Sequence, residues 1–303
     1  ALFGRVQHVA VQRRIRRVFC LRQRMAAGTA LFPVHSQKAQ AQARPLSSRM
    51  ARKDIWGHKG QETRCTYDGI FVHPLFHSRF NHSDASGMLH LVNTALDQTR
   101  NFLVKSTCVF LTLGTSWVYE NLQSASIVSN CHKLPQSLFR KRLLTLEESK
   151  TAILAFANSL KALNPNCRLI LTLSPVRHLK DGFENNQLSK AILRLAIHEC
   201  MQNDVAVSYF PTYELVLDDL RDYRFYTEDL LHPNDLAIRY IWEKFVECYF
   251  DENTKTILDK VDDINQYLSH RKVSSDHHDA TATARIRDKI IEINPLLGRT
   301  FDV

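Results

Sequence analysis

Short runs of β-forming residues alternate with amphipathic helical patterns along most of this chain, and this alternation is what most restricts its fold. The runs over 108–113, 168–174 and 205–210 are predicted strands, rich in Val, Ile, Leu, Phe and Thr. The segments over 85–103 and 145–163 place apolar residues at helical spacing. Consecutive parallel strands need a crossover connection, usually a helix. The sequence therefore predicts an α/β layer fold built on a parallel sheet.

Polar residues at helix ends support these boundaries. Asp84 is a predicted N-cap, Thr145 with Glu148 is a predicted capping box, and Asn234 is expected to cap a further helix. For the helix expected over 187–201, the inward face is predicted to carry Leu188, Ala191, Ile192, Leu195 and Ala196. Two more amphipathic helices, joined by a polar loop over 272–279, are expected within 254–294.

The basic residues are unevenly distributed. Residues 1–53 contain 12 Lys or Arg and no Asp or Glu, whereas the remaining 250 residues contain 28 basic and 31 acidic groups. The excess of positive charge therefore lies in one block and not on a folded face, so a nucleic-acid partner is not expected. We divide the chain into an atypical basic segment over 1–67, an α/β domain over 68–252 and a helical extension over 253–303.

The basic block has no sustained period, although Val9 and Val11 could seed a short strand. Three interpretations of it remain open. It has the Arg-rich, acid-free composition of an organelle transit peptide. It has the charge of a basic arm that binds nucleic acid or anionic lipid. It also has the aperiodic character expected of an out-of-frame replacement of the natural segment.

Several classes of protein are not expected from the composition. No apolar run approaches the roughly 18 residues of a membrane-spanning helix. The seven cysteines are scattered and never spaced as C-x-x-C, which disfavours a disulfide framework or a zinc site and favours the reducing cytoplasm. The chain has no G-x-G-x-x-G, P-loop or G-x-S-x-G motif, so neither a nucleotide cofactor nor a metal ion is predicted.

The most specific local pattern is the segment from Asp229 to Pro233, with His232 three residues after Asp229. Pro233 and the Asn234 cap place His232 in a turn that leads into a helix, where the carboxylate of Asp229 can reach the imidazole. A carboxylate that fixes the tautomer of a histidine is typical of a general base acting on a hydroxyl nucleophile. A turn with a purely structural His and Asp is the alternative.

Polar residues also follow two predicted strands, at positions where α/β proteins bind ligands. After the first come Gly114, Thr115 and Ser116, of which Ser116 could be a nucleophile, an oxyanion donor or a turn residue. After the second come Arg177, His178 and Lys180, which could face an anionic or polar ligand. Asn130 and His132 form a further polar cluster. Each set has a structural role as its alternative.

Long segments of the chain resemble the GSCFA domain family. They are GTSWVYE at 114–120, NCHKLP at 130–135, SPVRHLKDG at 174–182, NQLSKAILRLA at 186–196 and the stretch over 209–245, with HSRF at 77–80. The resemblance covers roughly 71–270. It implies similarity to the SGNH (GDSL-like) hydrolases, with a three-layer α/β/α, flavodoxin-like parallel sheet. In those enzymes a Ser after the first strand attacks an ester, and a D-x-x-H motif supplies the base.

The resemblance makes Asp229 and His232 the orienting acid and the base. Gly114, Thr115, Asn130, His132, Arg177, His178 and Lys180 are then candidates for substrate binding. Ser116 stands where the superfamily has the Asn of G-x-N, and no G-S-C-F-A stretch occurs within 1–70. We therefore expect a sheet incomplete at its N-terminal end. Ser116 is a possible nucleophile only if it replaces the Ser of that stretch.

The function implied is an SGNH-like esterase or acyl-transfer enzyme that acts on a small-molecule or glycan ester, without a membrane partner. The alternative is a catalytically inactive anion- or carbohydrate-binding domain on the same scaffold. The sequence leaves the oligomeric state and the acyl acceptor open.

Overall fold

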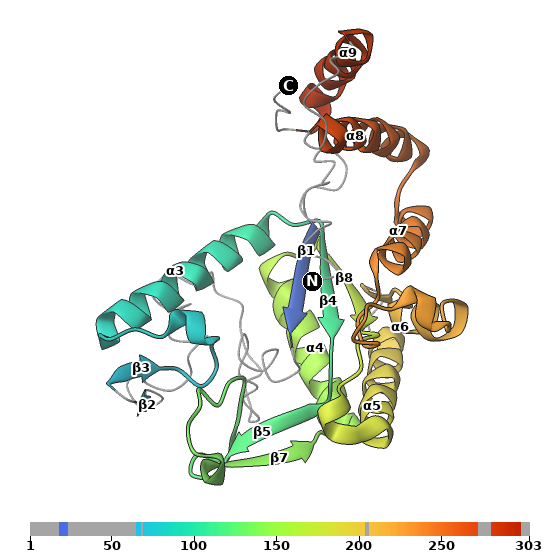
Figure 1. Ribbon diagram of the computed structural model, residues 1–303. Coiled ribbons are helices and arrows are strands. Elements are labelled where there is room, and N and C mark those ends of the chain that lie inside the picture. Colours follow the sequence, from blue (N-terminus) through green and yellow to red (C-terminus); the bar gives the residue numbers. More distant parts are fainter. Residues whose placement is uncertain (1–17, 24–64, 68, 204–205, 272–279, 298–303) are drawn as a thin grey trace.

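The computed structural model describes residues 18–23, 65–67, 69–203, 206–271 and 280–297. Its centre is a parallel sheet in the order β1-β4-β8-β9 (Figure 1). These strands are β1 (Val18–Gln23), β4 (Cys108–Leu113), β8 (Arg168–Leu173) and β9 (Val207–Tyr209). The three strands predicted from the sequence are therefore present, and each is parallel to its neighbour.

Strand β1 differs from the expectation of a sheet that lacks its first strand. Residues Val18 to Gln23 pair in parallel with Cys108 to Leu113 along the whole length of β4. The sequence signal was short because only four apolar residues in a row lie between Arg17 and Arg22. The strand that Val9 and Val11 could seed lies outside the described residues, as does most of the segment expected to carry the G-S-C-F-A stretch.

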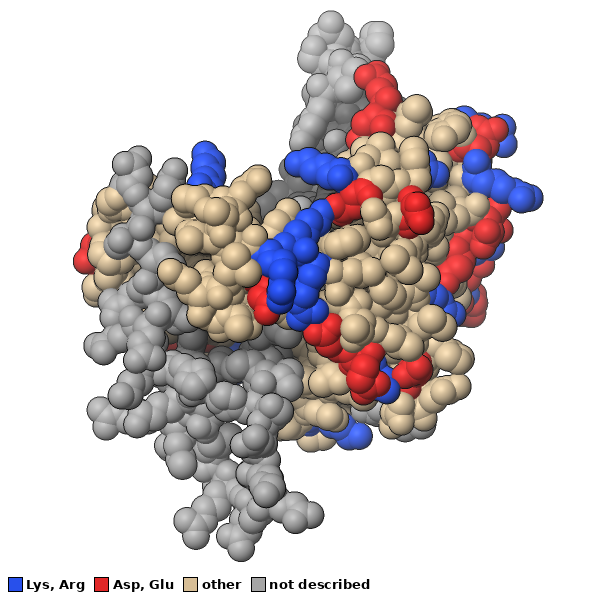
Figure 2. All heavy atoms as spheres, turned by 90° about the horizontal axis from the view of Figure 1, so that it is seen from below, with Lys and Arg blue, Asp and Glu red and all other residues tan. Residues whose placement is uncertain are grey.

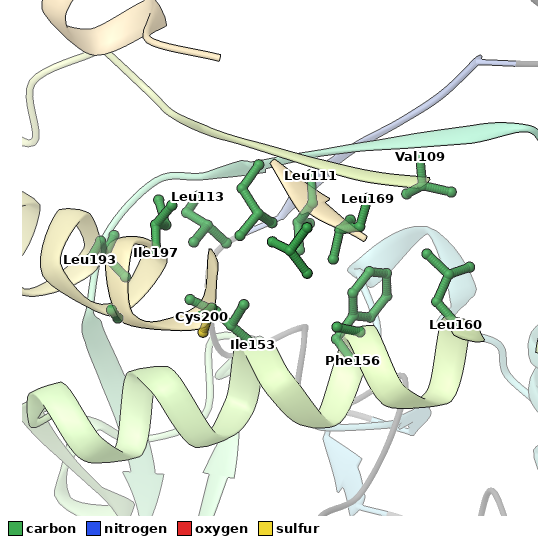
Figure 3. Packing of buried hydrophobic residues seen from close by; sticks show 14 of the residues in the cluster. Val109, Leu111, Leu113, Ile153, Phe156, Leu160, Leu169, Leu193, Ile197 and Cys200 are labelled. Carbon is green, nitrogen blue, oxygen red and sulfur yellow. The ribbon is translucent and has the colours of Figure 1, made fainter. Parts of the chain in front are cut away.

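One face of the sheet is covered by α4 (Leu146–Leu163) and α5 (Gly182–Asn203). Figure 3 shows Ile153, Phe156 and Leu160 of α4 pointing toward the side chains of β4 and β8. Leu193, Ile197 and Cys200 of α5 join the same cluster. The burial of these strands on both faces explains why they read as continuous apolar runs and not as alternating ones.

The opposite face of the sheet is covered by α7 (Asp235–Tyr249). Phe110 of β4 and Phe210, which follows β9, each make edge-to-face contacts with Phe245 of α7, with ring centroids 5.0 and 5.3 Å apart. Ile170 and Ile241 belong to the same buried cluster. Helices on both faces of a parallel sheet make a three-layer α/β/α architecture, which confirms the predicted fold class.

The remaining elements surround this core. Two helices are α3 (Ala85–Val104) and the short α6 (Thr212–Glu214), which continues as a π-helical turn over Leu215–Asp219. An antiparallel sheet contains β5 (Trp117–Asn121), β6 (Ser126–Val128) and β7 (Phe139–Leu143), and a hairpin pairs β2 (Cys65–Tyr67) with β3 (Ile70–Val72). Short 3-10 turns are η2 (Ser78–Phe80), η3 (Gln136–Leu138), η4 (Leu179–Asp181) and η6 (Tyr223–Phe225).

Helix boundaries follow the predicted capping residues. The Asp84 side chain accepts from the N–H of Gly87 at the start of α3. Thr145 and Glu148 form both hydrogen bonds of a capping box at the start of α4. The Asn234 side chain accepts from the backbone of α7. These contacts satisfy N–H groups that have no acceptor within the helix.

The buried face of α5 agrees with the predicted one only in part. Leu188 and Leu195, expected to point inward, are 49% and 53% exposed. Ala196 is buried as predicted, and the other buried residues of the helix are Asn186, Ser189, Lys190, Leu193, Ile197 and Cys200. The helical period was correct but its phase was wrong, because three of the inward positions carry polar side chains that pair with the ends of the sheet.

Two helices follow α7, namely α8 (Glu252–Arg271) and α9 (Ala280–Leu297). They pack together through Leu258, Val261, Ile264, Ile290 and Ile293, against Trp242 and Val246 of α7. Both lie where the sequence predicts amphipathic helices, and the predicted loop between them lies outside the described residues. Within the part of the chain that is described, no helix combines the length and the apolar character needed to cross a membrane.

Candidate functional site

Three polar loops gather at the carboxyl-terminal edge of the parallel sheet. In Figure 1 the arrows of β1 and β4 point to this edge, near β5 and β7. Residues 114–116 follow β4, residues 174–178 follow β8, and the turn over 227–232 precedes α7. Ligand sites of open α/β sheets lie at this edge, so the sequence-predicted residues on these loops can be compared directly.

The turn before α7 holds Asp229 and His232 together. Asp229 Oδ2 lies 2.5 Å from His232 Nδ1. The turn is closed by hydrogen bonds from the N–H of Thr227 to the carbonyl of His232 (2.8 Å) and from the N–H of Leu230 to the carbonyl of Thr227 (2.9 Å). Leu230 adopts a positive φ of 56°, which a non-glycine residue rarely takes. The predicted pairing of the two side chains is therefore present in the geometry.

The second carboxylate oxygen of Asp229 is fully engaged. Oδ1 accepts from the hydroxyl of Thr227 (2.6 Å) and from the N–H groups of Leu231 (2.8 Å) and His232 (3.0 Å). The Thr227 hydroxyl first, and then these N–H groups, hold the pKa of Asp229 well below its usual range. An ionised carboxylate at Nδ1 keeps a proton on that nitrogen, which leaves Nε2 as the basic atom of His232.

The Nε2 atom of His232 has no hydrogen-bond partner among the described residues. The His232 side chain is 43% exposed, and its hydrogen bond within the described residues runs from Nδ1 to Asp229. A histidine that is oriented on one nitrogen and open on the other can remove a proton from a molecule bound beside it.

Arg177 connects the loop after β8 to this turn. Its Nη1 donates to the carbonyl of Leu230 (3.2 Å) and its Nη2 to the hydroxyl of Tyr226 (3.3 Å). The guanidinium also lies 4.9 Å from the centre of the Tyr226 ring. Leu230 stands between Asp229 and His232, so Arg177 holds the turn that carries them. Arg177 was predicted to bind substrate. If it does, the same guanidinium must serve both the substrate and the turn.

Gly114 and His178 are brought together from different strands. A side-chain carbon at Gly114 would lie 3.7 Å from Nε2 of His178, so the imidazole faces the glycine Cα. The backbone N–H of His178 donates to Oδ1 of Asn186 on α5 (3.0 Å). Lys180 lies close along the chain and is exposed in η4. The loops after β4 and β8 therefore lie side by side at Gly114 and His178.

Thr115 and Ser116 point into the protein. Ser116 is 0% exposed, and its hydroxyl donates to the carbonyl of Ser189 (3.2 Å) and lies 3.1 Å from the Ser189 hydroxyl. The N–H of Ser116 also donates to Ser189 Oγ (2.7 Å), and the Thr115 and Ser189 hydroxyls are 3.0 Å apart. These contacts attach the loop after β4 to α5. They place the Ser116 hydroxyl in the core and not at an accessible surface.

Asn130 and His132 belong to a separate polar cluster after β6. The N–H of His132 donates to Oδ1 of Asn130 (2.9 Å), and Nε2 of His132 lies 2.8 Å from the carbonyl oxygen of His73. His132 is 7% exposed, and burial lowers its pKa. Within the described residues, the hydrogen bonds of this pair do not extend to the three loops.

Lys190 of α5 was not identified from the sequence. It is 1% exposed, and its Nζ donates to the carbonyls of Gly114 and Ser174, at 2.6 Å each. Burial lowers the pKa of this lysine to about 7. The available signal was the spacing of Asn186, Ser189 and Lys190, which puts three polar side chains on one helical face.

The charges around this edge are mixed. Figure 2 views the molecule from below and shows Lys and Arg side chains beside Asp and Glu. On β7, Arg140 pairs with Glu120, and Lys141 pairs with Asp181. In the described ranges, no group of three or more His, Cys, Asp or Glu side chains is arranged to hold a metal ion.

The three-layer fold and the His–Asp pair near its strand ends define an α/β protein with a cluster of polar loops at one edge of its parallel sheet. The GSCFA family model matches residues 32–245, more than two thirds of the 303 residues. The chain therefore belongs to the GSCFA family, as the resemblance indicated. The match begins inside the basic block and includes both Asp229 and His232. No curated protein matches the chain.

Proposed function

We propose that this chain is an SGNH-like esterase or acyl-transfer enzyme, with His232 as general base and Asp229 as the carboxylate that orients it. The observation that carries the proposal is the 2.5 Å contact between Asp229 Oδ2 and His232 Nδ1 on an exposed turn. A structural turn would need only the backbone hydrogen bonds. The additional imidazole–carboxylate contact and the open Nε2 are what a base requires.

In the proposed reaction, Nε2 of His232 takes the proton of a hydroxyl group or a water molecule. At the same time the oxygen of that hydroxyl or water bonds to the ester carbonyl carbon. The carbonyl π electrons move to oxygen and give a tetrahedral oxyanion. When this intermediate collapses, the bond to the leaving alkoxide breaks and the alkoxide receives the proton from the imidazolium. Only an acyl group and a proton are transferred.

The attacking oxygen comes from water or from a hydroxyl other than that of Ser116. That side chain is fully buried, and its hydroxyl is bonded to Ser189. Labelling with a fluorophosphonate followed by peptide mapping tests this assignment. Modification at Ser116 would overturn it, because the reagent has to reach a nucleophilic hydroxyl.

The substrate is a polar ester, with carbohydrate esters as the class to examine first. His178 beside Gly114, and Lys180 nearby, present donors to a polyhydroxylated or anionic group at this edge. Arg177 supports the same surface through its contact with Leu230.

The test is hydrolysis of p-nitrophenyl acetate by the full chain and by His232→Ala and Asp229→Asn variants. A general base contributes about 10² to 10⁴-fold, so His232→Ala should lower kcat/KM by that factor. Asp229→Asn should lower it by up to about 10⁴-fold through loss of the correct tautomer. His90→Ala, at an exposed position of α3, is the matched control. Activity that survives in His232→Ala with unchanged folding would refute the assignment.

The second candidate is a binding domain that retains the scaffold without catalysis. The burial of Ser116 favours it, because the residue that the sequence offered as nucleophile is unavailable in the structure. Saturation-transfer NMR with N-acetylglucosamine and with inorganic phosphate would test binding. Binding by a chain that hydrolyses no ester, retained in His232→Ala, would favour this candidate over the enzyme.

We also propose that the protein works in the cytoplasm. Cys108, Cys167, Cys200 and Cys248 are free thiols. Burial raises the pKa of Cys108 to about 12 and of Cys200 to about 11, so these two remain unreactive thiols. Fractionation followed by immunodetection of the full chain would test the location.

A further inference from the structure

Helix α5 presents a buried row of polar side chains to the loops of the candidate site. We call Asn186, Ser189 and Lys190 the α5 polar row. Asn186 accepts from the N–H of His178, and Ser189 accepts from the N–H of Ser116. Lys190 differs from the other two, because its ammonium bonds to both loops at once.

Lys190 joins the ends of two adjacent strands. Its two acceptors, Gly114 O and Ser174 O, belong to the first residues after β4 and β8. The side chain is 1% exposed, and its hydrogen bonds within the described residues are to these two carbonyls. A buried ammonium without a carboxylate partner carries a large desolvation cost. An apolar residue would avoid that cost but would leave both carbonyls without this donor, so the lysine is placed to join the two loops.

A continuous series of contacts runs from Lys190 to the His–Asp pair. Lys190 holds the Ser174 carbonyl, and the Ser174 hydroxyl accepts from the N–H of Val176 (3.3 Å). The next residue, Arg177, donates to the carbonyl of Leu230, which lies between Asp229 and His232. A shift at the end of β8 would therefore be transmitted to the turn that carries the proposed base.

We propose that Lys190 is a positioning residue that ties the loops after β4 and β8 together and so fixes Gly114, His178 and the Asp229–His232 turn relative to one another. The role of Lys190 in catalysis rests on the proposed function, whereas the coupling of the two loops does not. Lys190 touches neither His232 nor the exposed surface, so it acts through the loops that it holds.

The charge state of Lys190 gives a readout that a purely structural side chain would lack. Its lowered pKa places the loss of the proton in an accessible range, and a neutral amine donates more weakly to the two carbonyls than an ammonium does. Other titratable or charged side chains on the surrounding elements include Arg177, His178, Lys180, Asp181, Glu184, Arg194, Tyr213 and Glu214. Of these, His178 is the imidazole beside Gly114, so its contribution has to be separated.

The first experiment is an NMR titration of the full chain from pH 6 to pH 10. The ¹³Cε signal of Lys190 reports its proton, and the backbone amides of Thr115 and Leu230 report the two coupled regions. Both amides should shift with the midpoint of the Lys190 signal, in the wild type and in a His178→Gln background. In Lys190→Met these pH-dependent shifts should disappear.

The second experiment measures hydrolysis of p-nitrophenyl acetate. Misplacement of catalytic groups by about 1 Å can cost 10²-fold, so Lys190→Met should lower kcat by up to about 10²-fold with a smaller change in KM. Lys190→Arg keeps the charge and should recover part of kcat. Lys244→Met, at a surface ion pair with Glu247 on α7, is the matched control and should leave activity unchanged.

The two experiments can refute the positioning role and the proposed function separately. If Lys190 titrates and the amides of Thr115 and Leu230 do not follow it, the positioning role is refuted even where the chain is active. If Lys190→Met leaves those amides and kcat as in the wild type, the role is refuted as well. If the chain hydrolyses no ester while the amides follow Lys190, the coupling stands and the proposed function falls.

Discussion

His73, directly after β3, should make the stability of this protein depend strongly on acid. The residue is 3% exposed, and its Nδ1 accepts from the N–H of Leu75 (3.2 Å). That contact requires the neutral ring with its proton on Nε2. Burial first, and then the neighbouring His132, lower the pKa of His73 from 6.5 to about 4.

The direction and size of the effect follow from linkage. Between pH 4 and pH 6.5 the unfolded chain binds a proton at His73 that the folded chain does not, so the free energy of unfolding falls as the pH is lowered through this range. A difference of about 2.5 pH units is worth about 3.4 kcal/mol at 1.36 kcal/mol per unit. This is a large fraction of the roughly 5–15 kcal/mol that stabilises a typical domain.

The assay is urea unfolding, followed by circular dichroism, of the wild type and of His73→Gln from pH 4.5 to pH 7.5. Glutamine is uncharged and offers an acceptor to Leu75, so the stability of this variant should depend less on pH. The difference between the two free energies of unfolding should change by about 2.5 kcal/mol over this range. Carboxylate titration affects both proteins and cancels. His90→Gln, at an exposed position, should follow the wild type. Equal pH dependence in all three proteins would refute the burial argument.

Two further predictions concern the helices that cover the sheet, both measured by urea unfolding at pH 7.5. Leu193→Ala should cost about 2–5 kcal/mol because Leu193 is 0% exposed, whereas Leu188→Ala should stay within about 0.5 kcal/mol. Equal costs would contradict the orientation of α5. Thr145→Ala should cost about 1 kcal/mol through loss of the capping box at α4, and Thr145→Ser should restore most of it. An unchanged stability in Thr145→Ala would show that this cap contributes nothing.

Features of the fold that depend on neighbouring residues were predictable. The strand over 108–113 lies in one run of β-forming residues, and the caps at Asp84, Thr145 and Asn234 act on residues two or three positions away. Such signals are local, because both partners of each contact lie within one short segment of the sequence. Strand β1 was missed because its pairing with β4 joins residues that are about 90 positions apart.

The phase of α5 shows where a local rule fails. Counting apolar residues favoured the face with Leu188 and Leu195, whereas the structure buries the face with Ser189 and Lys190. Hydrophobicity describes transfer from water, but a polar side chain can be buried at low cost when its donors and acceptors are paired. The partners of this face are the loop residues after β4 and β8, and their identity depends on the tertiary fold.

The same distinction separates the parts of the candidate site. Asp229 and His232 are three residues apart, so a sequence pattern could predict their contact. Ser116 and Ser189 are 73 residues apart, and Lys190 and Gly114 are 76 apart, so no pattern linked them. The hydroxyl of Ser116 suited a nucleophile by its place in the sequence, but its long-range partner commits it to the core. The chemistry of this site can therefore be proposed from a local motif, whereas its positioning depends on contacts that only the folded chain creates.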